Sequence, residues 1–247
     1  MAQSGYGRIR LFDDFCGPEI PVATAIAYGA ASGGMHSIGP YRVTGDVVEV
    51  DTGIVGLGKS GGWVRIGGNN EDGKGAAVGT EAVFSPTLNG PLAIEARVEL
   101  RILTTTSVFV GFAGLNADDV AEPVTSTGTA ITYVDTNVCG FIFDSQLTAK
   151  EWHMPYSGGS ATAPTASNDV DSDILPVAAE SVVLRVEIDR NGTARWYIDG
   201  VLKQTVANAV STTVLLAALC GAWGTTTTAT DIDADYLAVE AERDWTV

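Results

Sequence analysis

The stretch VEIDRNGTARWYIDG, residues 186–200, consists of two runs in which apolar and polar side chains alternate on either side of a short turn. Alternation with a period of two is typical of β-strands that bury one face. A three-residue loop, Arg190-Asn191-Gly192, with Gly192 in the left-handed conformation, would pair Asp189 with Thr193. The stretch therefore predicts a β-hairpin whose turn has a defined length.

This loop length also predicts the register of the hairpin. It pairs apolar residues with apolar residues on one face: Ile188 with Ala194, Val186 with Trp196, and Leu184 with Ile198. The same register places Glu187 beside Arg195, and Arg185 beside Tyr197, on the opposite face. Because a slip of one residue would expose every apolar side chain, the register is well specified.

Similar short runs recur along the whole chain, between clusters of Gly, Asn, Asp, Pro and Thr, and helical periodicity is nearly absent. The candidate strands are Arg8–Phe12, Val47–Val50, Trp63–Ile66, Ala77–Phe84, Leu92–Leu103, Ser107–Ala113, Ile131–Val134, Val138–Asp144, Lys150–Met154, Val182–Asp189, Ala194–Ile198, Val214–Cys220 and Asp233–Glu240. About a dozen strands in 247 residues predict an all-β chain that folds as one antiparallel β-sandwich spanning residues 1–247.

Composition excludes several classes of function. The chain has 14 Lys and Arg against 30 Asp and Glu, a net charge of −16, so it repels the phosphates of nucleic acids. Its three cysteines are far apart, which argues against a disulfide framework and favours folding in a reducing cytoplasm. We expect no signal peptide, because the first residues lack an apolar core, and no membrane span.

One near-match to a catalytic motif lies in the hairpin itself. Glu187, Asp189 and Asn191 approximate the E-x-D-x-E trio of laminarinase-like glycosidases, in which two carboxyl groups act as nucleophile and acid/base. Asn191 cannot donate a proton as an acid, and it falls in the turn rather than on the strand. The sequence therefore disfavours a glycosidase and predicts no catalytic residues.

A second near-match is the glycine-rich run GIVGLGKSGG at residues 53–62. It fits the phosphate-loop spacing G-x-x-x-x-G-K-S, with Lys59 at the lysine position, and it also fits two unrelated glycine motifs. All of these motifs need a helix directly after the glycines. The strand-like Trp63–Ile66 follows instead, so we interpret the run as a glycine loop without nucleotide or other cofactor.

Metal binding has only one weak candidate. Asp169, Asp171 and Asp173 imitate the start of a calcium loop, but Ile174 stands at the sixth place, where such a loop needs glycine. A solvated acidic loop is the favoured interpretation. We also expect Asp231, Asp233 and Asp235 to face solvent, and His153 to lie at a surface strand edge.

The hairpin, the WYIDG sequence at 196–200, the closing strand Ala234–Val239 and the opening Phe12–Phe15 resemble the concanavalin A-like, or laminin-G-like, jelly-roll domain. The resemblance covers nearly the whole chain, and it implies an antiparallel sandwich in which the last strand completes a sheet.

A narrower resemblance is to tailed-bacteriophage virion proteins with this fold. It is carried by Phe12–Phe15, by Gly140–Asp144 followed by Trp152-His153, and by the hairpin region 184–206. It implies a non-enzymatic capsid decoration or cement protein, made in the host cytoplasm and placed on the virion surface. The implied partners are the major capsid protein and other copies of the chain, with a trimer favoured. We expect residues 1–10, as an extended arm, and loops 29–40 and 157–173 to order on neighbouring subunits.

The main alternative is a glycan-binding, lectin-like module of a fibre or spike that serves host adsorption. Such a module would present exposed aromatic rings on one concave face, and the candidates are Trp152, Tyr156, Tyr197 and Trp223. A glycosidase is the second alternative.

Overall fold

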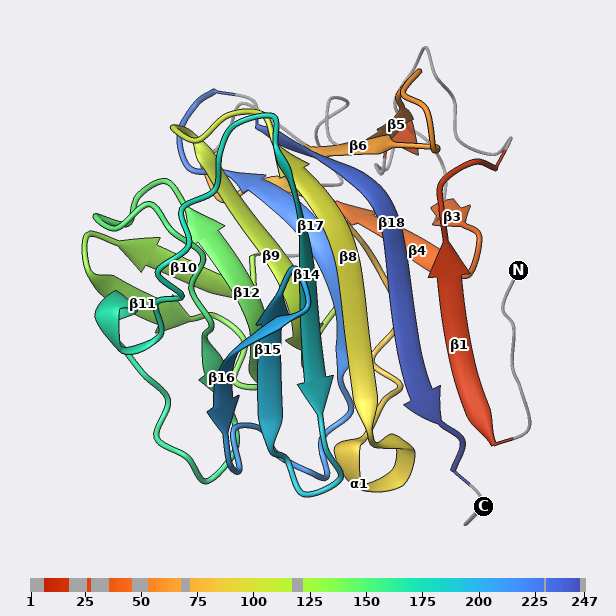
Figure 1. Cartoon of the computed structure of the whole chain (residues 1–247), viewed down its shortest axis with the longest axis vertical. Coiled ribbons are helices and arrows are strands. Elements are labelled where there is room, and N and C mark those ends of the chain that lie inside the picture. Colours follow the sequence, from red (N-terminus) through yellow and green to blue (C-terminus); the bar gives the residue numbers. More distant parts are fainter. Residues whose placement is uncertain are drawn as a thin grey trace.

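The structure is a computed structural model, and it describes residues 7–17, 26–27, 36–45, 53–67, 72–116, 122–228 and 230–244. Two antiparallel sheets pack face to face (Figure 1). The nine-stranded sheet contains, in spatial order, β16 (Val201–Val206), β15 (Ala194–Ile198), β14 (Ser181–Ile188), β8 (Leu92–Leu100), β18 (Asp231–Glu242), β6 (Val64–Gly67), β5 (Gly53–Gly56) and β2 (Ile26–Ala27), with β1 (Arg8–Asp13) also paired to β18.

The seven-stranded sheet forms the second layer. Its order is β13 (Tyr156–Ser157), β12 (Val138–Asp144), β9 (Thr106–Ala113), β17 (Ala217–Gly224), β7 (Gly75–Gly79), β4 (Tyr41–Gly45) and β3 (His36–Ile38). β10 (Val124–Thr127) and β11 (Ala130–Tyr133) pair with each other to form a separate hairpin. The described helices are α1 (Pro86–Asn89) and a 3₁₀ turn at Ser167–Asp169, and neither has the length needed to span a lipid bilayer.

The main core lies between the two sheets. Strands of the nine-stranded sheet contribute one apolar face each, so β8 buries Leu92, Ile94, Ala96, Val98 and Leu100 while its charged residues point outward. This one-sided burial is the reason that its sequence alternates so regularly.

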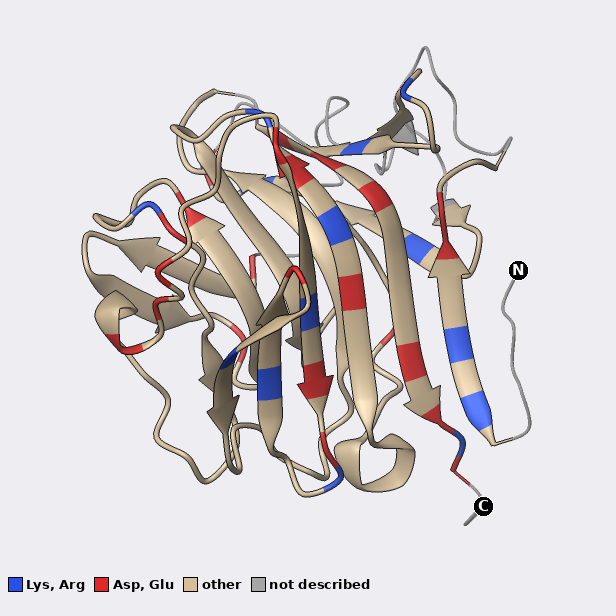
Figure 2. Ribbon diagram, in the orientation of Figure 1, with Lys and Arg blue, Asp and Glu red and all other residues tan. Residues whose placement is uncertain are grey.

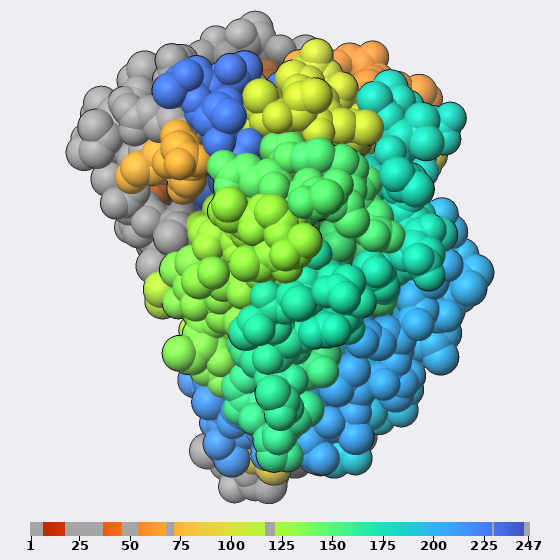
Figure 3. All heavy atoms as spheres, turned by 90° about the vertical axis from the view of Figure 1, so that its left-hand side faces the viewer, coloured from red at the N-terminus to blue at the C-terminus, as the bar shows by residue number. Residues whose placement is uncertain are grey.

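The seven-stranded sheet is buried on both faces. Within β9, Val108, Val110 and Phe112 belong to the main core, whereas Phe109 points the other way into a second apolar cluster. Ile142 of β12 and Leu219 of β17 join Phe109 there. This second cluster is covered by Val124 and Ile131 of the β10–β11 hairpin and by Val170. Figure 3 looks at this side, where the segment from about residue 145 to 175, in green to teal, spreads over the sheet.

The hairpin prediction is confirmed pair by pair, with Val186 opposite Trp196 and Glu187 opposite Arg195. Its turn also has the expected form: the Asp189 N–H donates to the Thr193 carbonyl at 2.8 Å, and Gly192 has φ +79°. The indole Nε1 of Trp196 donates to the Gly140 carbonyl at 2.8 Å, which ties the hairpin to the opposite sheet.

Several predictions were wrong. Lys150–Met154 is not a strand, because this segment makes only two isolated bridges, from His153 to Ile142 and from His153 to Asp171. His153 is fully buried, and its ring nitrogens lie 3.2 Å from the Ser167 and Ala149 carbonyls. Residues 8–10 belong to β1 and pair with β18, so they are no free arm. The predicted strand Val47–Val50, residues 1–6 of the arm and most of loop 29–40 lie outside the described residues.

Candidate functional site

The carboxylates of the near-catalytic trio lie on the outer face of the nine-stranded sheet. Glu187 accepts hydrogen bonds from Arg185 Nε at 2.8 Å and from the Tyr197 hydroxyl at 3.2 Å. Asp189 accepts one from Arg195 Nη2 at 2.8 Å, so Arg195 pairs with Asp189 and not with its cross-strand neighbour Glu187. Both carboxylates are thus held by arginine side chains within the sheet.

The same face carries a wider network of ion pairs, and Figure 2 shows acidic and basic positions on the neighbouring strands β8 and β18. Asp233 was expected to face solvent, but it is completely buried between Arg65, whose Nε lies 2.9 Å away, and Lys59, whose Nζ lies 2.8 Å away. Lys59 also contacts Glu99 at 2.9 Å and sits 4.8 Å above the Trp63 ring. The expectation failed because the cations that fold over Asp233 come from β6 and from the glycine loop, far away in the sequence.

The glycine-rich run at residues 53–62, which contains Lys59, has a structural role. The run forms strand β5 and the turn that leads into β6, and no helix follows it. Partial burial lowers the pKa of Lys59, but its hydrogen bonds to Asp233 and Glu99 outweigh this and raise it. Gly62 has φ +86°, and a Cβ there would lie 2.4 Å from the Asp14 carbonyl oxygen. The glycines permit close packing, and the partly exposed lysine pairs with Asp233 and Glu99 of the sheet.

The four aromatic candidates for glycan binding do not come together. Trp152 and Trp223 are completely buried, one against Phe143 and the other in the second apolar cluster, so neither offers a ring face to a sugar. Tyr156 and Tyr197 are partly exposed, but they belong to different sheets, on β13 and β15. This set therefore forms no single stacking surface.

The calcium candidates are also dispersed. Asp169 ends the 3₁₀ turn, Asp171 bridges to His153 through its backbone, and Asp173 has φ +57°. Within the described ranges, no group of three or more His, Cys, Asp or Glu residues has the arrangement to hold a metal ion.

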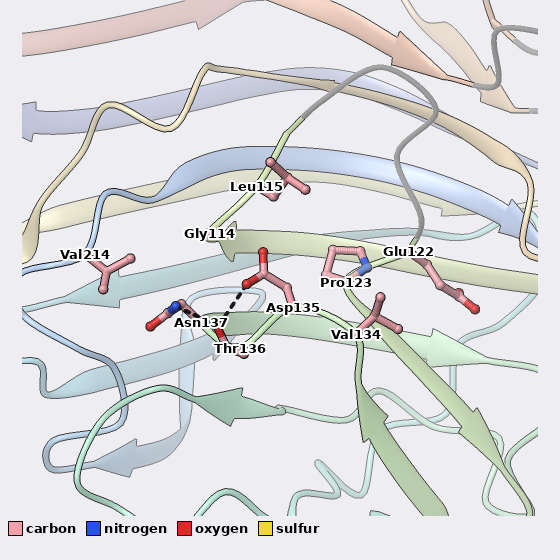
Figure 4. Close-up of a pocket in the computed structure, with 9 residues that line it drawn as sticks. All are labelled: Gly114, Leu115, Glu122, Pro123, Val134, Asp135, Thr136, Asn137 and Val214. Carbon is pink, nitrogen blue, oxygen red and sulfur yellow. Dashed lines mark hydrogen bonds between the residues drawn. The ribbon is translucent and has the colours of Figure 1, made fainter.

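The structure instead shows a pocket where β9, β12 and β17 meet at one end of the seven-stranded sheet (Figure 4). Its volume is about 300 Å³. The aliphatic residues Leu115, Pro123, Val134 and Val214 line it together with Gly114, Glu122, Asp135, Thr136 and Asn137. In Figure 4 the Asp135 carboxyl group points toward Gly114 in the middle of the pocket.

Asp135 holds the turn between β11 and β12. Its Oδ1 accepts the Asn137 N–H at 3.0 Å, and the Gly114 N–H donates to the Asn137 carbonyl at 2.9 Å. Its Oδ2 is buried and has no hydrogen-bond partner among the described residues. A carboxylate oxygen left in this state is unfavourable, because it has lost water without gaining a donor.

Glu122 is a second unusual carboxyl group, at the edge of the pocket. Burial, together with the nearby charges of Asp144 and Asp72, raises its pKa to about 8, although a hydrogen bond with Ser107 opposes the rise. Its Oε2 has no hydrogen-bond partner in the described part of the chain. Burial also raises the pKa of Asp144.

This pocket cannot be recognised from the sequence. The segment Val134–Asn137 is recognisable as a turn between two strands, but nothing local indicates that residues near 114, 123 and 214 surround it.

No protein-family model matches the chain, and no curated protein matches it either. Solved structures do. A protein of unknown function from Shewanella oneidensis MR-1 matches with a TM-score of 0.59 at 12% identity, over 100% of this chain and 92% of that one. The Bacillus licheniformis beta-glucanase matches with a TM-score of 0.53 at 13% identity, over 95% and 97%. The Emp46p carbohydrate recognition domain matches with 0.52 at 10%, over 84% and 89%.

These similarities establish the fold, which is the concanavalin A-like jelly-roll sandwich expected from the sequence. Sequence identities this low do not allow an activity to be transferred from these proteins to this chain. The same architecture occurs both in a glucanase and in a carbohydrate recognition domain.

Proposed function

We propose that the protein is a non-enzymatic binding protein that docks on another protein. Following its sequence resemblance, we propose a capsid decoration or other structural protein of a bacteriophage virion, made in the host cytoplasm and attached to the capsid surface as a homo-oligomer. The observation that carries the binding role is the pocket at the strand ends with its exposed aliphatic walls, whereas the β10–β11 hairpin and Val170 cover the outer face of the seven-stranded sheet. A sheet covered in this way leaves no long open groove for a polysaccharide along that face.

Two details of the structure support the proposal. The carboxylates Glu187 and Asp189 are engaged by arginine side chains, so they are no free nucleophile and acid pair. The pocket at the strand ends has two half-exposed aliphatic side chains, Leu115 and Val134, of the kind that protein partners cover.

Mass spectrometry of purified particles of the virus that encodes the chain tests the proposal. The protein is expected at a copy number that matches capsid symmetry. Its absence from the particle, with normal expression in the infected cell, would exclude the virion role.

Glycan binding is the second candidate, because the pocket is large enough for one sugar ring and offers the carboxylate of Asp135 and the amide of Asn137. A glycan-array screen tests it: saturable binding that Asp135→Asn removes is the expected result, and a blank array contradicts it.

A further inference from the structure

We propose that the pocket at the end of the seven-stranded sheet binds a lysine or arginine side chain of a partner protein. This inference rests on the binding role proposed above and assigns it to one surface. Three features of the pocket lead to it: aliphatic walls, a carboxylate oxygen without a partner among the described residues, and a negative charge on Asp135 with no lysine or arginine in the described lining.

The walls suit the stem of a long basic side chain. Leu115 and Val134 are 58% and 51% exposed, and both line the pocket with Val214 and Pro123. Lysine and arginine bury their methylene groups along apolar surface of this kind while the charged head reaches a polar group. Covering Leu115 and Val134 would also remove exposed apolar area from water.

The middle of the pocket suits the charged head. Asp135 uses Oδ1 for the Asn137 N–H, and its Oδ2 lacks a donor among the residues that the structure describes. The terminal torsion of an aspartate is broad, so the carboxyl group can turn Oδ2 toward a donor that enters the pocket. Gly114 leaves the room for this, because a Cβ there would lie 2.9 Å and 3.3 Å from the two carboxylate oxygens.

The charges select a cation over the other occupants. Among the described residues that line the pocket, Asp135 carries the charge, because burial raises the pKa of Glu122 to about 8 and keeps it protonated at neutral pH, and none of them is a lysine or arginine. A second copy of this chain is a less suitable occupant of this pocket, because its 14 Lys and Arg are outnumbered by 30 Asp and Glu, so we place the contacts between copies of the proposed oligomer outside this pocket. A neutral sugar could accept and donate hydrogen bonds here, but it would offer neither a positive charge to Asp135 nor an apolar stem to the aliphatic walls. A basic side chain offers both the positive charge and the apolar stem.

Nuclear magnetic resonance of the full-length, ¹⁵N-labelled protein tests the assignment with small probes. The cationic probes are N-acetyl-lysine amide and N-acetyl-arginine amide. N-acetyl-norleucine amide has a similar stem without the charge, and methyl glucoside represents a sugar. The cationic probes are expected to shift the amide signals of Gly114, Leu115 and Asn137 in a saturable way, with an affinity at least about tenfold above that for norleucine, which corresponds to about 1.4 kcal/mol.

Asp135→Asn is the decisive variant, because it removes the charge and keeps an oxygen that can accept the Asn137 N–H. The variant is expected to bind the lysine probe with about tenfold lower affinity, and its own spectrum shows whether the fold persists. Asp14→Asn is the matched control: Asp14 is exposed and also accepts a backbone N–H two residues later, from Cys16, but it does not line the pocket. This control should leave probe binding unchanged.

Four results would overturn the inference: no shifts at the pocket, equal binding of norleucine, tighter binding of methyl glucoside, or an Asp135→Asn variant that binds the lysine probe normally. These results are separable from the particle experiment. A protein that is present on the virion but fails the probe test keeps its proposed function and loses this pocket, whereas a protein that binds the cationic probes but is absent from the particle keeps the pocket and loses the virion role.

Discussion

The stability of the protein is expected to fall as the pH rises from 5 to 9, and Glu122 is the main cause. Its side chain is 7% exposed, and burial raises its pKa from 4.5 to about 8. In the unfolded chain the same carboxyl group loses its proton near pH 4.5. Between these two values the folded state therefore holds a proton that the unfolded state has released, and each pH unit shifts the equilibrium toward unfolding.

The size of the effect follows from the two pKa values. At about 1.36 kcal/mol per pH unit, the interval from 4.5 to about 8 corresponds to about 5 kcal/mol as an upper limit. Water that reaches the ionised carboxylate would reduce this figure, so we expect a loss of about 2–5 kcal/mol. The stabilisation is fully present below pH 4.5 and is lost once the pH exceeds about 8. Asp144, whose pKa burial also raises, has an effect of the same sign that begins at lower pH.

Urea unfolding at half-unit pH steps measures this, with Glu122→Gln as the test variant. Glutamine has the shape of the protonated acid, so the variant should match the native protein near pH 5 and exceed its stability by about 2–5 kcal/mol near pH 9. Glu180→Gln, at an exposed glutamate, is the control and should follow the native curve. The reasoning is refuted if the native curve is flat, or if Glu122→Gln falls as steeply as the native protein.

Three further predictions concern stability and use the same urea assay. Gly62→Ala should lower the free energy of unfolding by about 2 kcal/mol or more, because φ is +86° and the new Cβ would meet backbone atoms. Gly58→Ala is its control and should change the free energy of unfolding by less than about 1 kcal/mol, because that Cβ enters open space. Equal losses for the two variants would contradict the packing role of the loop. Trp196→Phe should cost about 2–4 kcal/mol through lost volume and a lost buried hydrogen bond, and a loss below about 1 kcal/mol would show that the hairpin is not anchored there. Arg65→Met should cost about 1–3 kcal/mol, because it leaves the buried Asp233 with one cation fewer, and Asp233→Asn in the Arg65→Met background should recover part of that loss.

The features that the sequence predicted correctly are those that neighbouring residues decide. The hairpin at 184–198 depends on alternation and on one glycine turn, so its register was available before any tertiary contact was known. The same is true of β12 and β15, whose bounds are the ones predicted. Strands that consist of small residues were missed or misplaced. β7, Gly75–Gly79, was placed later in the chain, because glycine and alanine carry little strand preference of their own.

The second apolar cluster can be recognised in the sequence from the apolar pattern of its strands. The runs Val108–Ala113 and Val138–Phe143 are almost continuously apolar, whereas Leu92–Leu100 alternates. Continuous apolar strands are buried on both faces, and alternating strands on one. Applied to these runs, the rule would have predicted a covered sheet, and with it the burial of Trp223.

The pocket and the burial of Asp233 could not have been predicted in this way. Each depends on residues that are distant in the sequence and that strand pairing alone brings together, as Lys59 and Asp233 show. The local sequence at 231–235 does not distinguish an aspartate that is covered by a lysine from one that is exposed to water. Local patterns therefore identify the strongly alternating strands, and only the complete topology establishes which polar groups lose contact with water.

The covered face also limits where this chain can recognise anything. The outer face of the nine-stranded sheet is occupied by ion pairs that satisfy one another, and the outer face of the seven-stranded sheet is occupied by the second apolar cluster. Recognition through either face would have to break contacts that already stabilise the fold. The strand ends are different, because Leu115 and Val134 remain exposed there and Asp135 keeps an oxygen without a donor among the described residues. A partner that binds at this end gains apolar contact and a hydrogen bond without breaking the ion pairs or the apolar cluster of the sheet faces, which is why we place its binding partner at the strand ends.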